Sequence, residues 1–152
     1  MDNDLERPVV ASMVMPHRKD RLSAVTARAA FSVLAGKALS LMPPRAIRHV
    51  LTAISARARP ATYEEAETAL TRVTTLSPSS AGQYGCLQRS LTAALLLRTH
   101  GTWATWCVGV PVRPPFRAHA WIEADGKIVS ELGTPQSYAR LIAVPPRSEG
   151  IA

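Results

Sequence analysis

The segment 86–101 constrains the fold most, because it predicts a helix that is apolar on nearly every side. Leu87, Leu91 and the run 93–97 point in several directions around such a helix, so the helix has to be buried. A loop rich in small and turn-forming residues, 77–85, precedes it, and Gly101 stands where a left-handed C-cap is expected. The sequence therefore predicts a buried helix that begins with Cys86.

Three more helices are predicted before this one. The first has apolar residues on one face at i, i+4, i+7, i+11 and i+14 and is ended by Pro43-Pro44. This face consists of Ala27, Phe31, Leu34, Ala38 and Leu41.

The second predicted helix is an amphipathic surface helix that Pro60 ends. Its apolar face is Ile47, Val50, Leu51 and Ile54, and its polar stripe is Arg45, Arg48, Ser55 and Arg59. Thr62 and Glu65 have capping-box spacing for the third helix. Its apolar side chains are Tyr63, Ala66, Leu70 and Val73.

After Gly101 the pattern changes to that of strands, over 103–110 and 117–123. Asp125-Gly126 is a hairpin signal, 127–132 is the predicted partner strand, and a short helix is expected around 137–142. The fold class is therefore α+β, with a helical N-terminal half followed by a cysteine-headed buried helix packed on an antiparallel sheet. We expect a flexible basic arm over 1–20 and a single domain over 21–152, with a helical part at 21–76 and a catalytic core at 84–135.

Composition excludes several classes of protein. The chain has 152 residues, of which 47% are hydrophobic, so it can build a core and is not disordered throughout. Two cysteines are too few for a disulfide scaffold, and no Cys or His pair has zinc-finger spacing. No apolar run approaches the ~20 residues of a membrane span, and the start Met1-Asp2-Asn3-Asp4 is acidic, unlike a signal peptide. We expect a cytoplasmic protein without a cofactor, metal or membrane.

The position of Cys86 predicts a reactive thiolate. The unpaired amides and dipole of a helix N-terminus favour negative charge, and the thiolate is the nucleophilic form of cysteine. The backbone N–H of Cys86 can also stabilise an oxyanion, with the Gln83 side chain as candidate second donor. A simple loop hydrogen bond is an equal alternative for Gln83. Cys107 lies in an apolar strand between Trp106 and Val108 and is expected to be a structural thiol.

A thiolate nucleophile needs a proton carrier and a group that orients it. His119, in the middle of a predicted strand, is the candidate carrier, and Asp125 and Glu131 compete for the orienting role. A two-residue hairpin loop would pair Ala124 with Lys127 and send Glu131 to the far face. A three-residue loop with Gly126 in the left-handed position pairs Glu123 with Lys127, and places His119 opposite Glu131. We expect the three-residue loop, and hence the set Cys86, His119 and Glu131, with Asp125 as a turn residue.

The C-terminal half resembles a known family over about residues 84–135. Its matching strings are Cys86-Leu87-Gln88-Arg89-Ser90-Leu91, Val108-Gly109-Val110, Pro115-Phe116, Ala118-His119-Ala120-Trp121-Ile122-Glu123 and Gly126-Lys127-Ile128-Val129-Ser130-Glu131. These strings resemble the transglutaminase-like cysteine peptidases of lasso peptide biosynthesis, with a papain/transglutaminase-like core. The resemblance implies an acid twelve residues after the histidine, usually aspartate, where this sequence has Glu131.

The resemblance also implies a reaction and partners. Family members remove the leader from a ribosomally made precursor peptide, and an asparagine-synthetase-like cyclase then joins the freed core amine to an acidic side chain. Stand-alone peptidases of this size leave leader recognition to a separate small winged-helix-like protein. Residues 1–80 predict helices only and do not resemble such a recognition domain, so a separate recognition partner is implied.

Other interpretations of the same residues remain open. Arg89 either positions substrate or pairs with a nearby carboxylate, and Trp121 is expected in the core or the wall of the cleft. An acyltransferase would use the same Cys, His and acid but pass the acyl group to an amine. A non-catalytic basic module that binds nucleic acid would account for the charge of +7, of which ten Lys/Arg against one acid lie between Arg7 and Arg59. It lacks the aromatic interleaving of such modules, so we expect no nucleic-acid partner.

Overall fold

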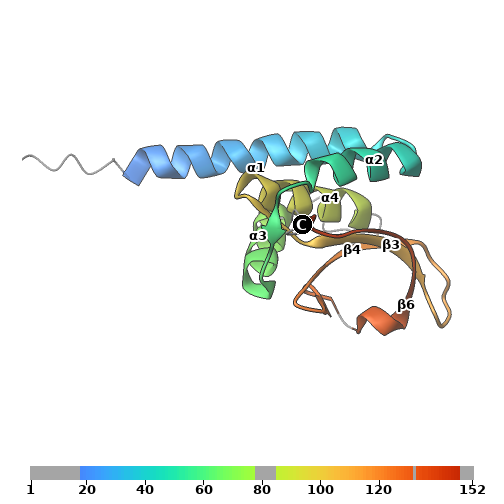
Figure 1. The fold of residues 1–152 in the computed structure, drawn as a ribbon. Coiled ribbons are helices and arrows are strands. Elements are labelled where there is room, and N and C mark those ends of the chain that lie inside the picture. The colour runs from blue at the N-terminus through green and yellow to red at the C-terminus, as the bar shows by residue number, and fades with distance from the viewer. Residues whose placement is uncertain (1–17, 78–84, 132, 148–152) are drawn as a thin grey trace, which may run out of the picture.

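The computed structural model describes residues 18–77, 85–131 and 133–147 (Figure 1). The helices are α1 (Arg18–Ser40), α2 (Pro44–Ile54), α3 (Tyr63–Leu76) and α4 (Cys86–Thr99), with a 3-10 turn at Pro135–Ser137. The strands are β1 (Arg59–Pro60), β2 (Thr102–Trp103), β3 (Thr105–Pro111), β4 (His119–Ala124), β5 (Lys127–Ile128) and β6 (Tyr138–Val144). An antiparallel sheet has the order β5-β4-β3-β6, and β1 pairs with β2 in parallel. The α+β class is confirmed.

Helix α4 is the centre of the fold. Its residues 90–97 are all buried, and its neighbours are α1, α3 and the strands β2, β3 and β4. Gly101, just past its end, has a φ of +80°, as expected for a left-handed cap. Within the described residues, no helix is long and apolar enough to cross a membrane. The burial of residues 90–97 is what the apolar character of this helix on nearly every side predicts.

Helix α1 begins at Arg18, inside the arm expected over 1–20, whose residues 1–17 lie outside the described residues. Its apolar face, expected from the spacing of Phe31, Leu34 and Leu41, is the exposed face: these side chains are 65%, 70% and 84% exposed. The face that packs on the domain carries small residues instead. It consists of Ala29, Ser32, Gly36 and Leu39.

Gly36 explains why the small face is the buried one. A Cβ at this position would lie 2.2 Å from Thr92 Oγ1 and 3.1 Å from the Thr92 Cα on α4. The two helices therefore approach so closely that only a glycine fits at the crossing. Close contact between backbones outweighs the burial of larger side chains on the other face of α1.

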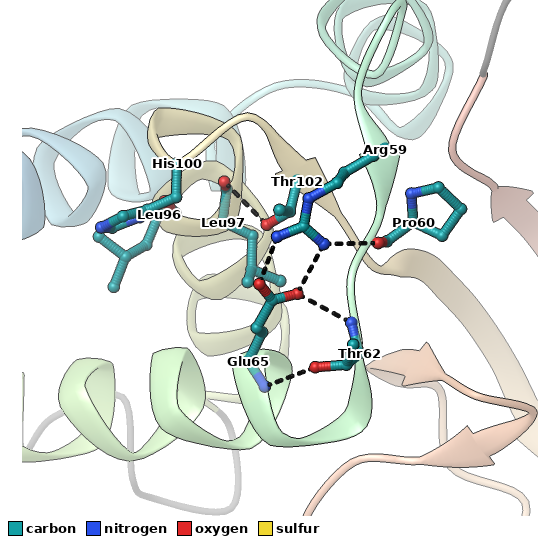
Figure 2. Close-up of polar contacts among 8 residues, drawn as sticks. All are labelled: Arg59, Pro60, Thr62, Glu65, Leu96, Leu97, His100 and Thr102. Carbon is teal, nitrogen blue, oxygen red and sulfur yellow. Dashed lines mark hydrogen bonds and ion pairs between the residues drawn. The ribbon is translucent and has the colours of Figure 1, made fainter.

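The start of α3 is capped as the sequence predicts. The Thr62 hydroxyl accepts from the Glu65 N–H and the Glu65 carboxylate accepts from the Thr62 N–H, which completes a capping box (Figure 2). The same carboxylate binds the guanidinium of Arg59 at 2.5 Å. Arg59 was expected in the polar stripe of α2. Helix α2 ends at Ile54, however, and Arg59 lies in β1. Ser55, also expected in that stripe, is the C-cap residue of α2 and is fully buried.

The hairpin between β4 and β5 has the two-residue loop, so the expected three-residue register is wrong. Ala124 pairs with Lys127, and Glu123 pairs with Ile128. Asp125 and Gly126 have φ values of +50° and +71°, the signs that a type I′ turn requires. Glu123 is consequently not paired with Lys127 but buried, where it accepts from the Trp121 indole at 2.8 Å.

The end of the chain also differs from expectation. The short helix expected around 137–142 is the strand β6, which pairs with β3, and the expected strand 127–132 is ordered as a strand only at Lys127–Ile128. A Cβ on Gly109 of β3 would lie 2.3 Å from the Ala139 carbonyl oxygen of β6. Glycine at this bulge lets β6 approach β3 closely, which a local pattern of residues does not reveal.

We predict that Gly36→Ala destabilises the protein, although alanine favours a helix interior by about 1 kcal/mol. The clash with Thr92 costs more than that gain, so we expect a net loss of about 1–2 kcal/mol in the free energy of unfolding, measured by urea denaturation. Thr92→Ala removes the nearest atom and serves as the partner in a double-mutant cycle. If the double variant loses as much free energy of unfolding as the two single variants added together, contact between residues 36 and 92 is not the cause of the loss.

Candidate functional site

The structure brings three of the predicted site residues together where α4 meets the sheet. His119 Nε2 lies 2.5 Å from Glu131 Oε2. The imidazole also hydrogen-bonds the Cys86 thiol. All three side chains are partly exposed. A thiol, an imidazole and a carboxylate thus form one hydrogen-bonded row at the surface.

Cys86 is held in place by the first turns of α4. Ser90, one turn further along, is buried, and its hydroxyl accepts from the Trp106 indole N–H of β3 at 3.1 Å. This contact fixes the rotation and depth of the helix against the sheet. Cys86 is the first residue of the helix, so its sulfur lies at the N-terminal end of the helix dipole, and the backbone N–H groups of Ala120 and Leu87 also hydrogen-bond it.

Glu131 reaches His119 by a route that the sequence did not predict. Continued regular pairing in the two-residue register would place Glu131 on the far face, but the ladder ends after the Val129 N–H donates to the Ile122 carbonyl. Ser130 then has a φ of +54°, and this left-handed residue turns the chain. Its N–H donates to the Tyr63 hydroxyl of α3 at 3.3 Å. The bend brings the Glu131 side chain back to the imidazole.

Asp125, the rival candidate for the acid, has a structural contact instead. Its Oδ2 accepts from the Tyr63 N–H in the first turn of α3 at 2.7 Å. Tyr63 therefore contacts the hairpin twice, through its backbone at Asp125 and through its hydroxyl at Ser130. These contacts join α3 to both ends of the segment that leads to Glu131.

Arg89 lies against a carboxylate, one of the two alternatives expected for it. Its guanidinium donates to Glu131 Oε1 at 3.4 Å, while the other oxygen of Glu131 binds His119. Arg89 and Glu131 are both about one-fifth exposed, so neither ion is fully in water. The carboxylate is therefore oriented by two cationic partners that come from different elements, α4 and β4.

Trp121 does not line a cleft, contrary to one of the roles expected for it, because only 1% of it is exposed. It packs with Cys107 and Ile128 on one side of the sheet. Tyr138 of β6, which the sequence did not single out, stacks on the imidazole of His119 with ring centroids 5.7 Å apart. It also packs on Trp121 at 4.7 Å. Two aromatic rings thus support the imidazole from the sheet.

The electrostatics of the row favour an ion pair. The hydrogen bond from His119 lowers the pKa of the Cys86 thiol below its ordinary value, against the opposing effect of burial. The hydrogen bonds to Cys86 and then to Glu131 raise the pKa of His119 to about 9. Between these two pKa values Cys86 is a thiolate and His119 an imidazolium. Such a pair supplies a nucleophile together with a proton donor.

The other predicted residues fall outside this arrangement. Burial raises the pKa of the Cys107 thiol to about 12, so Cys107 is inert, as a structural thiol would be. Gln83, the candidate second oxyanion donor, lies outside the described residues. In the described part of the chain, no cluster of three or more His, Cys, Asp or Glu side chains has an arrangement that could hold a metal ion.

One hollow includes a residue of the row, and a second includes Tyr138, which stacks on the imidazole of His119. One, of about 350 Å³, is lined by residues of α3 together with Arg89, Ser130 and Glu131. The other, of about 490 Å³, is lined by the ends of β3 and β6, including Tyr138. Each hollow therefore contains a direct neighbour of His119. A further hollow of about 590 Å³, between α3 and the end of α4, contains none of the three residues of the row.

One comparison with known proteins gives a family for this chain. A family model described as "Transglutaminase-like superfamily" matches residues 29–143, from α1 to β6. No curated protein and no solved structure matches the chain. The matched region contains Cys86, His119 and Glu131, and it extends well beyond the segment 84–135 that carries the sequence resemblance.

We predict that iodoacetamide alkylates Cys86 at lower pH values than an ordinary thiol, which has a pKa of about 8.5, because the pKa of Cys86 is lowered. The rate is measured against pH by mass spectrometry in a Cys107→Ala background, which leaves one thiol. His119→Ala removes the group that lowers the pKa of Cys86 while burial remains, so the midpoint moves to higher pH. An unchanged midpoint in His119→Ala would show that the imidazole does not set the pKa of the thiol.

We also predict that the pKa of His119 depends on Tyr63 through Glu131. Glu131→Gln removes a carboxylate that stabilises the imidazolium, so the pKa of His119 falls from about 9. Tyr63→Phe loses only the hydroxyl that accepts from Ser130, and we expect a smaller fall in the same direction. The measurement is an NMR titration of the imidazole, with Glu64→Gln as a charge-matched control on the exposed side of α3. A Tyr63→Phe value equal to that of the wild type would exclude Tyr63 from the positioning of Glu131.

Proposed function

Because the chain belongs to the transglutaminase-like superfamily, which includes cysteine proteases and acyltransferases, we propose that it is a cysteine endopeptidase. Its proposed reaction is removal of the leader from a lasso precursor peptide. The observation that carries the proposal is the hydrogen-bonded row of Cys86, His119 and Glu131 with the thiol at a helix N-terminus. The family strings in 84–135 support the choice of substrate.

In the first half of the reaction, the Cys86 thiolate attacks the carbonyl carbon of the bond between leader and core. The carbonyl oxygen becomes an oxyanion, for which the Cys86 N–H is a donor in this proposal. The His119 imidazolium gives its proton to the leaving nitrogen, the C–N bond breaks, and the core departs as a free amine. The leader remains as a thioester on Cys86.

In the second half, water replaces the core. The neutral imidazole of His119 takes a proton from water, and the resulting hydroxide attacks the thioester carbonyl. The C–S bond breaks, the leader leaves as a carboxylic acid that loses its proton to water, and the thiolate–imidazolium pair is restored. Glu131 keeps the imidazole oriented throughout and stabilises its charged form, and Arg89 holds the other oxygen of that carboxylate.

The surroundings of the row suit a polypeptide substrate. An extended chain that is cut in the middle needs space on more than one side of the nucleophile. The hollows of about 350 and 490 Å³ lie beside two different neighbours of His119, Glu131 and Tyr138. Near the second hollow, the loop that follows β3 exposes Val112 and Phe116, which gives apolar surface for substrate side chains.

The proposal includes partners. A separate small leader-recognition protein of the winged-helix type would bind the leader, as the resemblance to stand-alone peptidases implies. An asparagine-synthetase-like cyclase would use the core with its free amine. We propose that the chain works in the cytoplasm, where such ribosomally made precursors arise.

We predict that the chain cleaves a lasso precursor from its own gene cluster when the matching recognition protein is present, with mass spectrometry of both products as the readout. Cys86→Ala abolishes cleavage, and His119→Ala slows it by about 10³-fold or more. Glu131→Gln slows it by about 10- to 100-fold, because the imidazole loses its orienting charge. Asp125→Asn is the matched control, since asparagine tolerates a positive φ and keeps an acceptor for the Tyr63 N–H.

Three results would contradict the proposal. Cleavage by Cys86→Ala would exclude covalent catalysis by this thiol. Loss of activity in Asp125→Asn together with full activity in Glu131→Gln would assign the acid to the other carboxylate. A leader that is joined to an amine, in place of a leader with a free carboxylate, would make the enzyme an acyltransferase with the same three residues.

A further inference from the structure

The exposed face of α1 is an apolar surface that nothing in the proposed peptidase reaction uses. Ala27, Phe31, Leu34, Ala38 and Leu41 form it, and we call these residues the α1 stripe. Leu41 directly follows the last residue of the helix. The large side chains of the stripe are mostly exposed. Monomeric soluble proteins rarely expose contiguous apolar patches, and those that do usually bind something there.

The described part of the chain does not cover the stripe. Helix α1 packs on α4 and α3 with its opposite face, through Ala29, Ser32 and Gly36. Figure 1 shows α1 along one side of the domain, with its N-terminal part extending past the other elements. The stripe therefore faces outward along a straight helix that is already anchored from behind.

The spacing within the stripe indicates what kind of surface fits it. Successive members are four, three, four and three residues apart, which is the a/d pattern of a coiled-coil seam over two heptads. This pattern pairs with a second helix that carries the same spacing. In the same register, Arg28 and Lys37 occupy the flanking e and g positions, and both are exposed. Charges at these positions select the partner of a coiled coil.

The charge beside the stripe favours a partner other than a second copy of this chain. Residues 24–59 contain basic side chains and no Asp or Glu. The basic residues of this range that lie on α1 are Arg28 and Lys37. A second copy that met this one through the same stretch of α1 would offer these two cations no carboxylate, so the seam would gain no ion pair. A partner with carboxylates at the corresponding positions would instead be attracted.

We propose that the α1 stripe docks an amphipathic helix of a separate protein, one with apolar residues at heptad spacing flanked by Asp and Glu. Docking there leaves Cys86 accessible, because α1 packs on the buried part of α4 at Thr92, whereas the thiol is at the partly exposed N-terminus of that helix. This inference rests on the surface of α1 and stands independently of the peptidase reaction.

The test uses the full chain and a synthetic helical peptide with leucines at a and d and glutamates at e and g. A second peptide has lysines in place of the glutamates. We expect fluorescence anisotropy to detect binding of the acidic peptide only. Phe31→Ser and Leu34→Ser should each weaken this binding at least tenfold, whereas Leu141→Ser, which removes an equally exposed leucine from β6, should not. The double variant Arg28→Glu, Lys37→Glu should reverse the preference between the peptides.

Several results would overturn the inference. Equal binding of both peptides, or binding that survives Phe31→Ser and Leu34→Ser, would remove the stripe as the docking site. Self-association of the wild type in analytical ultracentrifugation that Leu34→Ser abolishes would make a second copy the occupant. A large fall in the melting temperature of Phe31→Ser would show that the chain itself covers the stripe. Unchanged alkylation of Cys86 in each variant confirms that the variants are folded.

Discussion

The burial of α4 is the constraint on which the rest of this structure depends. A helix that is apolar on nearly every side can only be stable when other elements surround it, and here α1, α3 and the sheet do so. Its two ends, 86–89 and 98–99, stay half-buried, whereas 90–97 are buried. Cys86 thus lies at a helix N-terminus that solvent can reach, which favours a reactive thiol.

The sequence predicted the presence of the helices better than their orientation. Capping residues and periodicity determine where α3 and α4 begin, and both are local properties. The buried side of α1 depends on a contact between Gly36 and Thr92, which are far apart in the chain. Hydrophobicity alone favoured the side with Phe31 and Leu34. The small residues on the opposite face, Ala29, Ser32 and Gly36, were the signal of close helix packing. A hydrophobic pattern does not reveal this signal, because such residues contribute little hydrophobicity.

The hairpin brings Glu131 next to His119, as expected, although the expected strand register is wrong. We inferred Glu131 from a three-residue loop, whereas the loop has two residues and the strand ends early. Two tertiary contacts decide the outcome: Asp125 accepts from the Tyr63 N–H, and Ser130 donates to the Tyr63 hydroxyl. Strand pairing rules consider only the two strands, so the effect of α3 on the hairpin could not be predicted from them. The family strings identified Glu131 independently of this geometry.

The contacts of Tyr63 with the hairpin also determine how long the side chain of residue 131 has to be. Its carboxylate meets the imidazole of His119 with one oxygen and the guanidinium of Arg89 with the other. The bend at Ser130 sets the backbone of residue 131 relative to both partners, and the contact to Arg89 is already long at 3.4 Å. An aspartate at this position would be shorter by one methylene and could keep both contacts only if the bend moved. The bend is held by Tyr63, so α3, α4 and β4 together determine which carboxylate this site accepts.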